Sequence, residues 1–130
     1  MVKSILLVED DFFIRDLYTI VLTKEAYLVD TAEDGEQGIL KAHEKQYDLI
    51  LLDIMLPKAS GVDVLRTIRS RQDSKSHLSP VIAVTNMGQE DVIKTMLDLG
   101  AAKYIFKSTL NNQGLIEEIN MFFAAQPEKI

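Results

Sequence analysis

The chain contains no cysteine and no tryptophan, and only 3 of its 130 residues are proline. Without cysteine, disulfides, thiolate metal sites and cysteine nucleophiles are all excluded. Long apolar runs are missing as well. Ile5–Val8 is too short for the core of a signal peptide, and no run approaches the length of a membrane span. We therefore expect a cytoplasmic protein.

Basic residues are the minority among the charges, with 14 Lys and Arg against 20 Asp and Glu, for a net charge of −6. This balance disfavours nucleic acid and anionic membrane surfaces as direct partners. The hydrophobic fraction of 47% and the charged fraction of 26% are ordinary for a globular chain. At this length we expect one domain, residues 1–130, without room for a separate effector domain.

The most informative stretch is Tyr47–Pro57, in which four apolar residues stop abruptly at Asp53. A run this short, with a proline close behind it, predicts a central strand buried on both faces rather than a helix. Asp53 then lies at the carboxyl end of the strand, where ligands collect in open α/β sheets. For Asp53 alone, a helix cap or a turn is the simpler interpretation.

Other apolar runs end in polar residues in the same way, and each is followed by apolar residues at helical spacing. We predict further strands at Ser4–Val8, Leu28–Ala32, Val81–Val84 and Lys103–Phe106. Helices are predicted around Ile14–Leu22, from Asp34 to about Lys45, from Ser60 to about Arg71, around Val92–Leu97 with Gly100 beyond its end, and around Leu115–Phe123. The polar stretch Gln72–Pro80 is predicted to be a surface connection.

This alternation predicts an α/β fold with a five-stranded parallel sheet and helices on both faces. The acidic run Glu9-Asp10-Asp11, together with Asp53, Thr85 and Lys107, then falls on one edge of that sheet. Clustered carboxylates favour a hard cation such as Mg²⁺, which usually shares its coordination sphere with a phosphate. A lysine and a hydroxyl suit the remaining phosphoryl oxygens, and an aspartate can accept the phosphoryl group as an acyl phosphate.

The motifs ILLVEDD, YDLILLDIMLPKASG, VIAVTN and DLGAAKYIFK, in this order, resemble those of response-regulator receiver domains of two-component signalling. The resemblance covers nearly the whole chain and is to chemotaxis-regulator-like receivers. It implies a flavodoxin-like, doubly wound sheet in the strand order 2-1-3-4-5. It also implies a phosphorylation-activated switch rather than an enzyme acting on external substrates. A histidine kinase or phosphotransfer protein would supply the phosphoryl group.

The resemblance further implies roles for individual residues. Asp53 resembles the phosphoacceptor, and Thr85 and Lys107 resemble the residues that bind the phosphoryl group. Mg²⁺ would be held by Glu9, mainly through water, by Asp10 and Asp53, and by the backbone carbonyl of Met55. Asp11 is better explained as the cap of the first helix than as a ligand.

Thr85 and Tyr104 resemble a switch pair that changes partner binding through one face of the domain. That face comprises the helix at about Gln89–Leu99, the strand Lys103–Phe106 and the last helix. The implied output is contact with a downstream protein or with a second copy of the domain. Both a free-standing regulator and the receiver part of a longer response regulator fit the chain.

Two positions depart from the family pattern, and two methionines stand at positions that affect how long the signal lasts. Ser108 follows Lys107 where the family usually has proline, often after a cis bond, so the isomer of the Lys107–Ser108 bond stays open. Asn86 follows Thr85 where a smaller residue is more frequent. Met55 and Met87 stand where the family flanks the path of the hydrolytic water, which predicts slow self-dephosphorylation.

The residues argue against two other classes of protein. A phosphatase-like enzyme with an aspartyl nucleophile needs a second acid, typically two residues after the nucleophile, and Met55 occupies that position. A flavodoxin-like cofactor binder needs a loop of Gly, Ser and Thr after the first strand, where Glu9-Asp10-Asp11 would repel phosphate.

Overall fold

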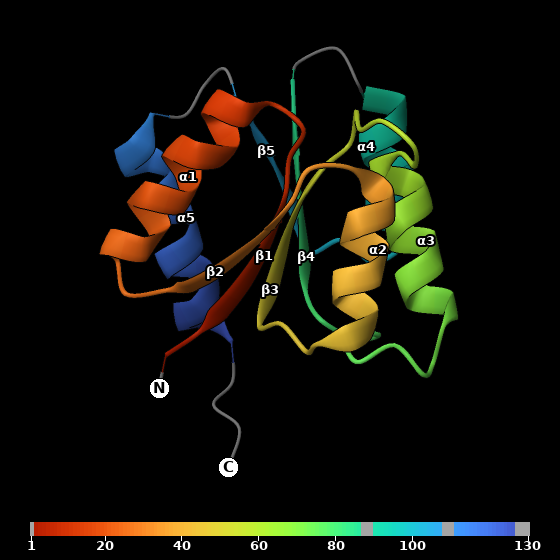
Figure 1. The fold of residues 1–130 in the computed structure, drawn as a ribbon. Coiled ribbons are helices and arrows are strands. Elements are labelled where there is room, and N and C mark those ends of the chain that lie inside the picture. Colours follow the sequence, from red (N-terminus) through yellow and green to blue (C-terminus); the bar gives the residue numbers. More distant parts are fainter. Residues whose placement is uncertain (1, 87–89, 108–110, 127–130) are drawn as a thin grey trace.

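The fold was taken from a computed structural model, which describes residues 2–86, 90–107 and 111–126 (Figure 1). Strands and helices alternate along these residues. The strands are β1 (Ser4–Val8), β2 (Leu28–Ala32), β3 (Leu49–Asp53), β4 (Val81–Thr85) and β5 (Lys103–Phe106). The helices are α1 (Phe12–Lys24), α2 (Gly35–Glu44), α3 (Gly61–Ser70), α4 (Glu90–Asp98) and α5 (Asn112–Ala125).

The five strands form one parallel sheet in the order β2-β1-β3-β4-β5. Helices α1 and α5 cover one face of this sheet, and α2, α3 and α4 cover the other (Figure 1). Each face has its own cluster of buried apolar side chains. The predicted doubly wound α/β fold and its strand order are confirmed.

Strand β3 lies at the centre of the sheet, and all five of its residues are buried. Its side chains alternate between the two apolar clusters, since Ile50 and Leu52 pack on one face and Leu49 and Leu51 on the other. This two-sided burial explains why the strand reads as an uninterrupted apolar run. The apolar run ends at Asp53, which is still buried at the carboxyl end of the strand.

The helix caps follow from the local sequence. Asp11 accepts hydrogen bonds from the backbone of Phe13 at 2.9 Å and Ile14 at 3.1 Å, so it is the cap of α1. The predicted caps Asp34 and Ser60 accept from the backbone of Gln37 at 2.8 Å and Asp63 at 3.2 Å. Each side chain satisfies a backbone N–H that has no partner inside its helix.

The prediction of a surface connection at Gln72–Pro80 is wrong for three serines in it. Ser74, Ser76 and Ser79 are buried. Their hydroxyls donate to the backbone carbonyls of Ala42 at 3.0 Å, Lys45 at 2.6 Å and Tyr47 at 2.7 Å, which belong to the end of α2 and the approach to β3. Burial is tolerated because each hydroxyl donates to a backbone carbonyl of the helix end or the following loop and so stays hydrogen-bonded away from water.

The loop between β3 and α3 is fixed by close backbone approaches. A Cβ on Gly61 would lie 2.4 Å from the carbonyl oxygen of Asp53, so no other residue fits there without movement. Lys58 has a φ of 70°, in the left-handed region. The loop therefore carries a fixed turn directly beside the end of β3.

In the part of the chain that the structure describes, no helix has the length and apolarity needed to cross a bilayer.

Candidate functional site

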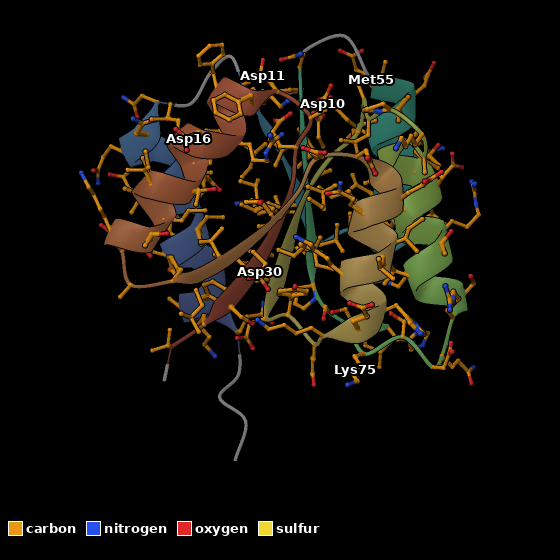
Figure 2. The ribbon with its side chains drawn as sticks, viewed as in Figure 1. Asp10, Asp11, Asp16, Asp30, Met55 and Lys75 are labelled. Atoms are coloured by element: carbon orange, nitrogen blue, oxygen red, sulfur yellow. The ribbon has the colours of Figure 1, made fainter. Side chains whose placement is uncertain are left out.

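The register of the sheet brings the predicted site residues to one edge. Val8 pairs with Leu52, and Asp53 pairs with Val84, so Glu9 and Asp53 leave neighbouring strands at the same level. Thr85 pairs with Phe106, directly before Lys107. Figure 2 labels Asp10, Asp11 and Met55 at this end of the molecule and Lys75 at the opposite end.

The Lys107 ammonium joins two carboxylates at this edge. Its Nζ lies 2.6 Å from Glu9 Oε1 and 2.8 Å from Asp53 Oδ2. All three side chains are largely buried, with exposed fractions of 11% for Lys107, 2% for Glu9 and 5% for Asp53. Buried charges of this kind are tolerated only when they are paired and hydrogen-bonded.

The remaining oxygens of the two carboxylates bind backbone N–H groups. Asp53 Oδ1 accepts from Met55 at 3.2 Å, and Glu9 Oε2 accepts from Asp11 at 3.1 Å. Both carboxylates are thus fixed at two points, one to the lysine and one to the backbone of their own loop.

Asp10 completes a group of three acids. Carboxylate oxygens of Glu9, Asp10 and Asp53 all lie within 4.8 Å of one another. Asp10 is exposed, whereas the other two are buried, so the group opens to solvent on the Asp10 side. An all-oxygen set with this spacing can hold a hard divalent cation.

The electrostatics of the site match this geometry. Burial raises the pKa of Glu9 above its ordinary 4.5, and the neighbouring Asp53 raises it further against the opposing hydrogen bond from Lys107. Partial burial and the nearby Glu9 raise the pKa of Asp10. Burial lowers the pKa of Lys107, but its hydrogen bonds to Asp53 and Glu9 outweigh this and leave the pKa above 10.5. The acids therefore favour an additional positive charge among them.

The predicted switch residues Thr85 and Tyr104 do not join the ion-pair cluster of Glu9, Asp53 and Lys107. Thr85 is buried, and its hydroxyl donates to the carbonyl of Asn86 at 3.2 Å. Tyr104 is 43% exposed and packs edge-on against Phe106, with 5.3 Å between the ring centroids. Met55 is 61% exposed at the rim of the site. The expectations for Met87 and for the Lys107–Ser108 bond fall on residues outside the described part of the chain.

One residue at the site was missed from the sequence. Arg15, in α1, donates from Nη1 to the carbonyl oxygens of Glu9 at 2.8 Å and Asp10 at 3.3 Å. A single arginine on a helix usually belongs to a solvated face, and no local pattern marks this one. Its position one turn inside the helix that follows the acidic run is the only signal the sequence carries.

A comparison with protein families finds that the response regulator receiver domain matches residues 5–120. The response regulator ArlR of Staphylococcus aureus is 37% identical over 126 residues, which cover 97% of this chain and 55% of ArlR. This chain therefore spans about half the length of the curated relatives that it matches.

Solved structures of receiver domains have the same fold as this chain. A CheY-like receiver domain protein from Methanospirillum hungatei is 29% identical, with a TM-score of 0.84 and 95% of both chains covered. The receiver domain of the sensor histidine kinase PA1611 from Pseudomonas aeruginosa, solved with a magnesium ion coordinated in its active-site cleft, is 26% identical. Its TM-score is 0.81, over 96% of this chain and all of that one. The chain belongs to the response regulator receiver domain family of two-component signalling, as the sequence motifs predicted.

Proposed function

We propose that this domain is a phosphorylation-driven switch in which Asp53 accepts a phosphoryl group from a histidine kinase or phosphotransfer protein. The observation that carries the proposal is the Lys107 ammonium held between the carboxylates of Glu9 and Asp53, with the Asp10 carboxylate beside them. This arrangement offers a nucleophile, a fixed cation and a set of oxygen ligands within one small site. We also propose that residues 1–130 form a single receiver domain.

In the transfer step, an oxygen of the Asp53 carboxylate attacks phosphorus and forms a P–O bond. The P–N bond of the donor phosphohistidine breaks, and its electron pair leaves with the histidine ring nitrogen. Lys107 shifts its hydrogen bond from Asp53 Oδ2 to a phosphoryl oxygen, because the Asp53 carboxylate loses its charge when one of its oxygens is phosphorylated. Glu9, Asp10, Asp53 and the backbone carbonyl of Met55 would hold Mg²⁺, which would neutralise charge on the phosphoryl oxygens.

The response is proposed to pass through Thr85 and Tyr104. The Thr85 hydroxyl turns from the Asn86 carbonyl to the new phosphoryl oxygens, which vacates space that the Tyr104 ring enters. Exposed apolar side chains on the adjoining elements support a binding face formed by α4, β5 and α5: Leu97, Tyr104 and Met121. Its partner is a downstream protein or a second copy of the domain.

Labelling with a small phosphodonor tests the proposal. With Mg²⁺ and an acyl phosphate or phosphoramidate, the wild type is expected to gain one phosphoryl group, and Asp53→Asn none. Asp63→Asn is the matched control, because Asp63 is an exposed aspartate on α3 whose carboxylate lies 3.5 Å from Arg66 and away from Lys107. Efficient labelling of Asp53→Asn, or of the wild type without a divalent ion, contradicts the proposal.

A further inference from the structure

Arg15 lies on the first turn of α1 and reaches back over the acidic loop. Side chains on a helix lean toward its N-terminus, which aims the guanidinium at the residues between β1 and α1. Its Nη1 contacts two consecutive carbonyl oxygens, those of Glu9 at 2.8 Å and Asp10 at 3.3 Å. Only 16% of the side chain is exposed.

The contact of one nitrogen with two consecutive carbonyls has a geometric consequence. In an extended strand, successive residues point in opposite directions, so neither their carbonyls nor their side chains converge. Here the carbonyls of Glu9 and Asp10 converge on Arg15. The carboxylates of the same two residues converge on Asp53, with oxygens within 4.8 Å of one another. The turn that Arg15 holds is the turn that lets adjacent acids enter one site.

The guanidinium is itself fixed by other elements. Its Nη2 lies 3.8 Å from Glu33 Oε2, in the connection between β2 and α2. The guanidinium carbon lies 5.7 Å from the centre of the Phe12 ring. The Glu33 carboxylate and the Phe12 ring both restrict the guanidinium, which helps to keep it on the two carbonyls. The ammonium group of lysine is not planar and cannot make the same set of contacts.

We propose that Arg15 is a positioning residue for the divalent-cation site. It fixes the backbone of Glu9 and Asp10 so that their carboxylates stay together before the ion arrives, and it does not contact the ion. This inference rests on the proposed function, since it assumes that the cation binds at Glu9, Asp10 and Asp53. Outer contacts that orient metal ligands typically change metal affinity by about 10- to 100-fold when they are removed.

Calorimetric titration of the unphosphorylated protein with Mg²⁺ tests this role without any transfer reaction. Arg15→Met is expected to raise the Mg²⁺ dissociation constant about ten-fold. Arg15→Lys keeps the charge but loses the planar fork, so it is expected to remain several-fold weaker than the wild type. Full recovery of affinity in Arg15→Lys overturns positioning by the planar guanidinium, because a single ammonium donor would then hold the loop equally well.

Arg69 provides a matched control for loss of stability. It is also a partly buried arginine whose Nη1 donates to a backbone carbonyl, that of His77 at 3.0 Å, on α3 and away from the acids. Thermal unfolding measures how far Arg15→Met and Arg69→Met each destabilise the fold. Arg69→Met is expected to bind Mg²⁺ like the wild type whatever its stability.

An unchanged dissociation constant in Arg15→Met, or an equal loss of affinity in both variants, overturns the inference. Failure of the wild type to bind Mg²⁺ is a different result. It would overturn the proposed function and this inference together.

Discussion

Replacing Lys107 by methionine removes the only ammonium between Glu9 and Asp53 among the described residues while keeping a side chain of similar length. The ion pairs measure 2.6 and 2.8 Å, and all three groups are largely buried. Removing one partner of a buried pair typically costs about 3–5 kcal/mol, because it leaves an uncompensated charge. The loss is limited here, since Glu9, whose pKa is already raised, takes up a proton more readily than an ordinary carboxyl. We expect the free energy of unfolding to fall by about 2–4 kcal/mol at pH 7 without metal.

The same variant is expected to gain more stability from Mg²⁺ than the wild type does. In the wild type, Lys107 occupies the carboxylates that the cation needs, so the two compete. Without the ammonium, Mg²⁺ meets unpaired acids and binds more tightly. In excess Mg²⁺, each ten-fold difference between the two dissociation constants stabilises Lys107→Met by about 1.4 kcal/mol more than the wild type, so the deficit of the variant should narrow.

Urea unfolding followed by circular dichroism, with EDTA and with excess Mg²⁺, measures both effects. Lys103→Met is the matched control, because Lys103 lies on β5 and pairs with Glu118 near the surface, with exposed fractions of 36% and 31%. Such pairs contribute about 0–1 kcal/mol and no Mg²⁺ dependence is expected. A Lys107→Met protein as stable as the wild type in EDTA, or stabilised less by Mg²⁺, would refute the reasoning.

The difference in free energy of unfolding between the wild type and Lys107→Met should depend on pH, because the pKa values of Glu9 and Lys107 are shifted in the folded protein. The pKa of Glu9 is raised above 4.5 in the folded state, so its charge opposes folding at neutral pH and this penalty is relieved as the pH falls through the raised pKa. The penalty is greater without Lys107. The difference in free energy of unfolding between the wild type and Lys107→Met should therefore become smaller as the pH is lowered. The stabilising contribution of Lys107, whose folded pKa lies above 10.5, is present below pH 10.5 and is lost as the pH rises through the folded value.

Three other variants, one of them a double substitution, probe separate parts of the molecule. Ser76→Ala is expected to lower the free energy of unfolding by about 1–3 kcal/mol, because it removes a fully buried hydroxyl that donates to a carbonyl at 2.6 Å and accepts from the Tyr47 backbone at 3.1 Å. Tyr47→Phe should cost stability only above the lowered pKa of Asp30, since the Tyr47 hydroxyl holds that pKa below 3.8 through a 2.7 Å hydrogen bond. Replacing Met55 by Asn and Met87 by Glu should speed decay of the phosphorylated form about ten-fold, equivalent to about 1.4 kcal/mol of barrier, by admitting and orienting water.

Each of these has a control or a refuting outcome. Ser70→Ala removes an exposed hydroxyl bound to a carbonyl at 3.1 Å and should change stability little, so equal losses in Ser70→Ala and Ser76→Ala would contradict the role of burial. Unfolding of Tyr47→Phe and wild type at pH 7 and at pH 3 should show a smaller difference at the lower pH, and a constant difference would exclude Asp30 as its cause. Label loss as fast in the wild type as in the methionine double variant would show that these residues do not control access of water.

The sequence predicted what depends on local pattern. Short runs placed every strand within one residue, most clearly the inner strands β1, β3 and β4, whose residues are almost all buried and apolar. Parallel strands in turn placed Glu9, Asp53, Thr85 and Lys107 at one edge. The strand order came only from the resemblance, because spacing along the chain does not say which strands are neighbours.

The contacts that escaped prediction join polar side chains to remote backbone. The buried serines of the connection before β4 and the Arg15 guanidinium all donate to carbonyl oxygens. The neighbouring residues in the sequence do not distinguish a polar side chain that donates to a distant carbonyl from one that faces water. Its partner is defined only by the folded chain, so composition and periodicity give it a surface position.

The central claim is that Asp53 itself carries the phosphoryl group, and locating the acyl phosphate tests it most directly. Borohydride reduces an acyl phosphate to an alcohol, so the labelled aspartate becomes homoserine and can be found by peptide mass spectrometry. After reaction with a small phosphodonor and Mg²⁺, we predict homoserine at position 53 and at no other aspartate. Homoserine at Asp10 or Asp11 instead, or labelled protein without homoserine at position 53, would contradict the account.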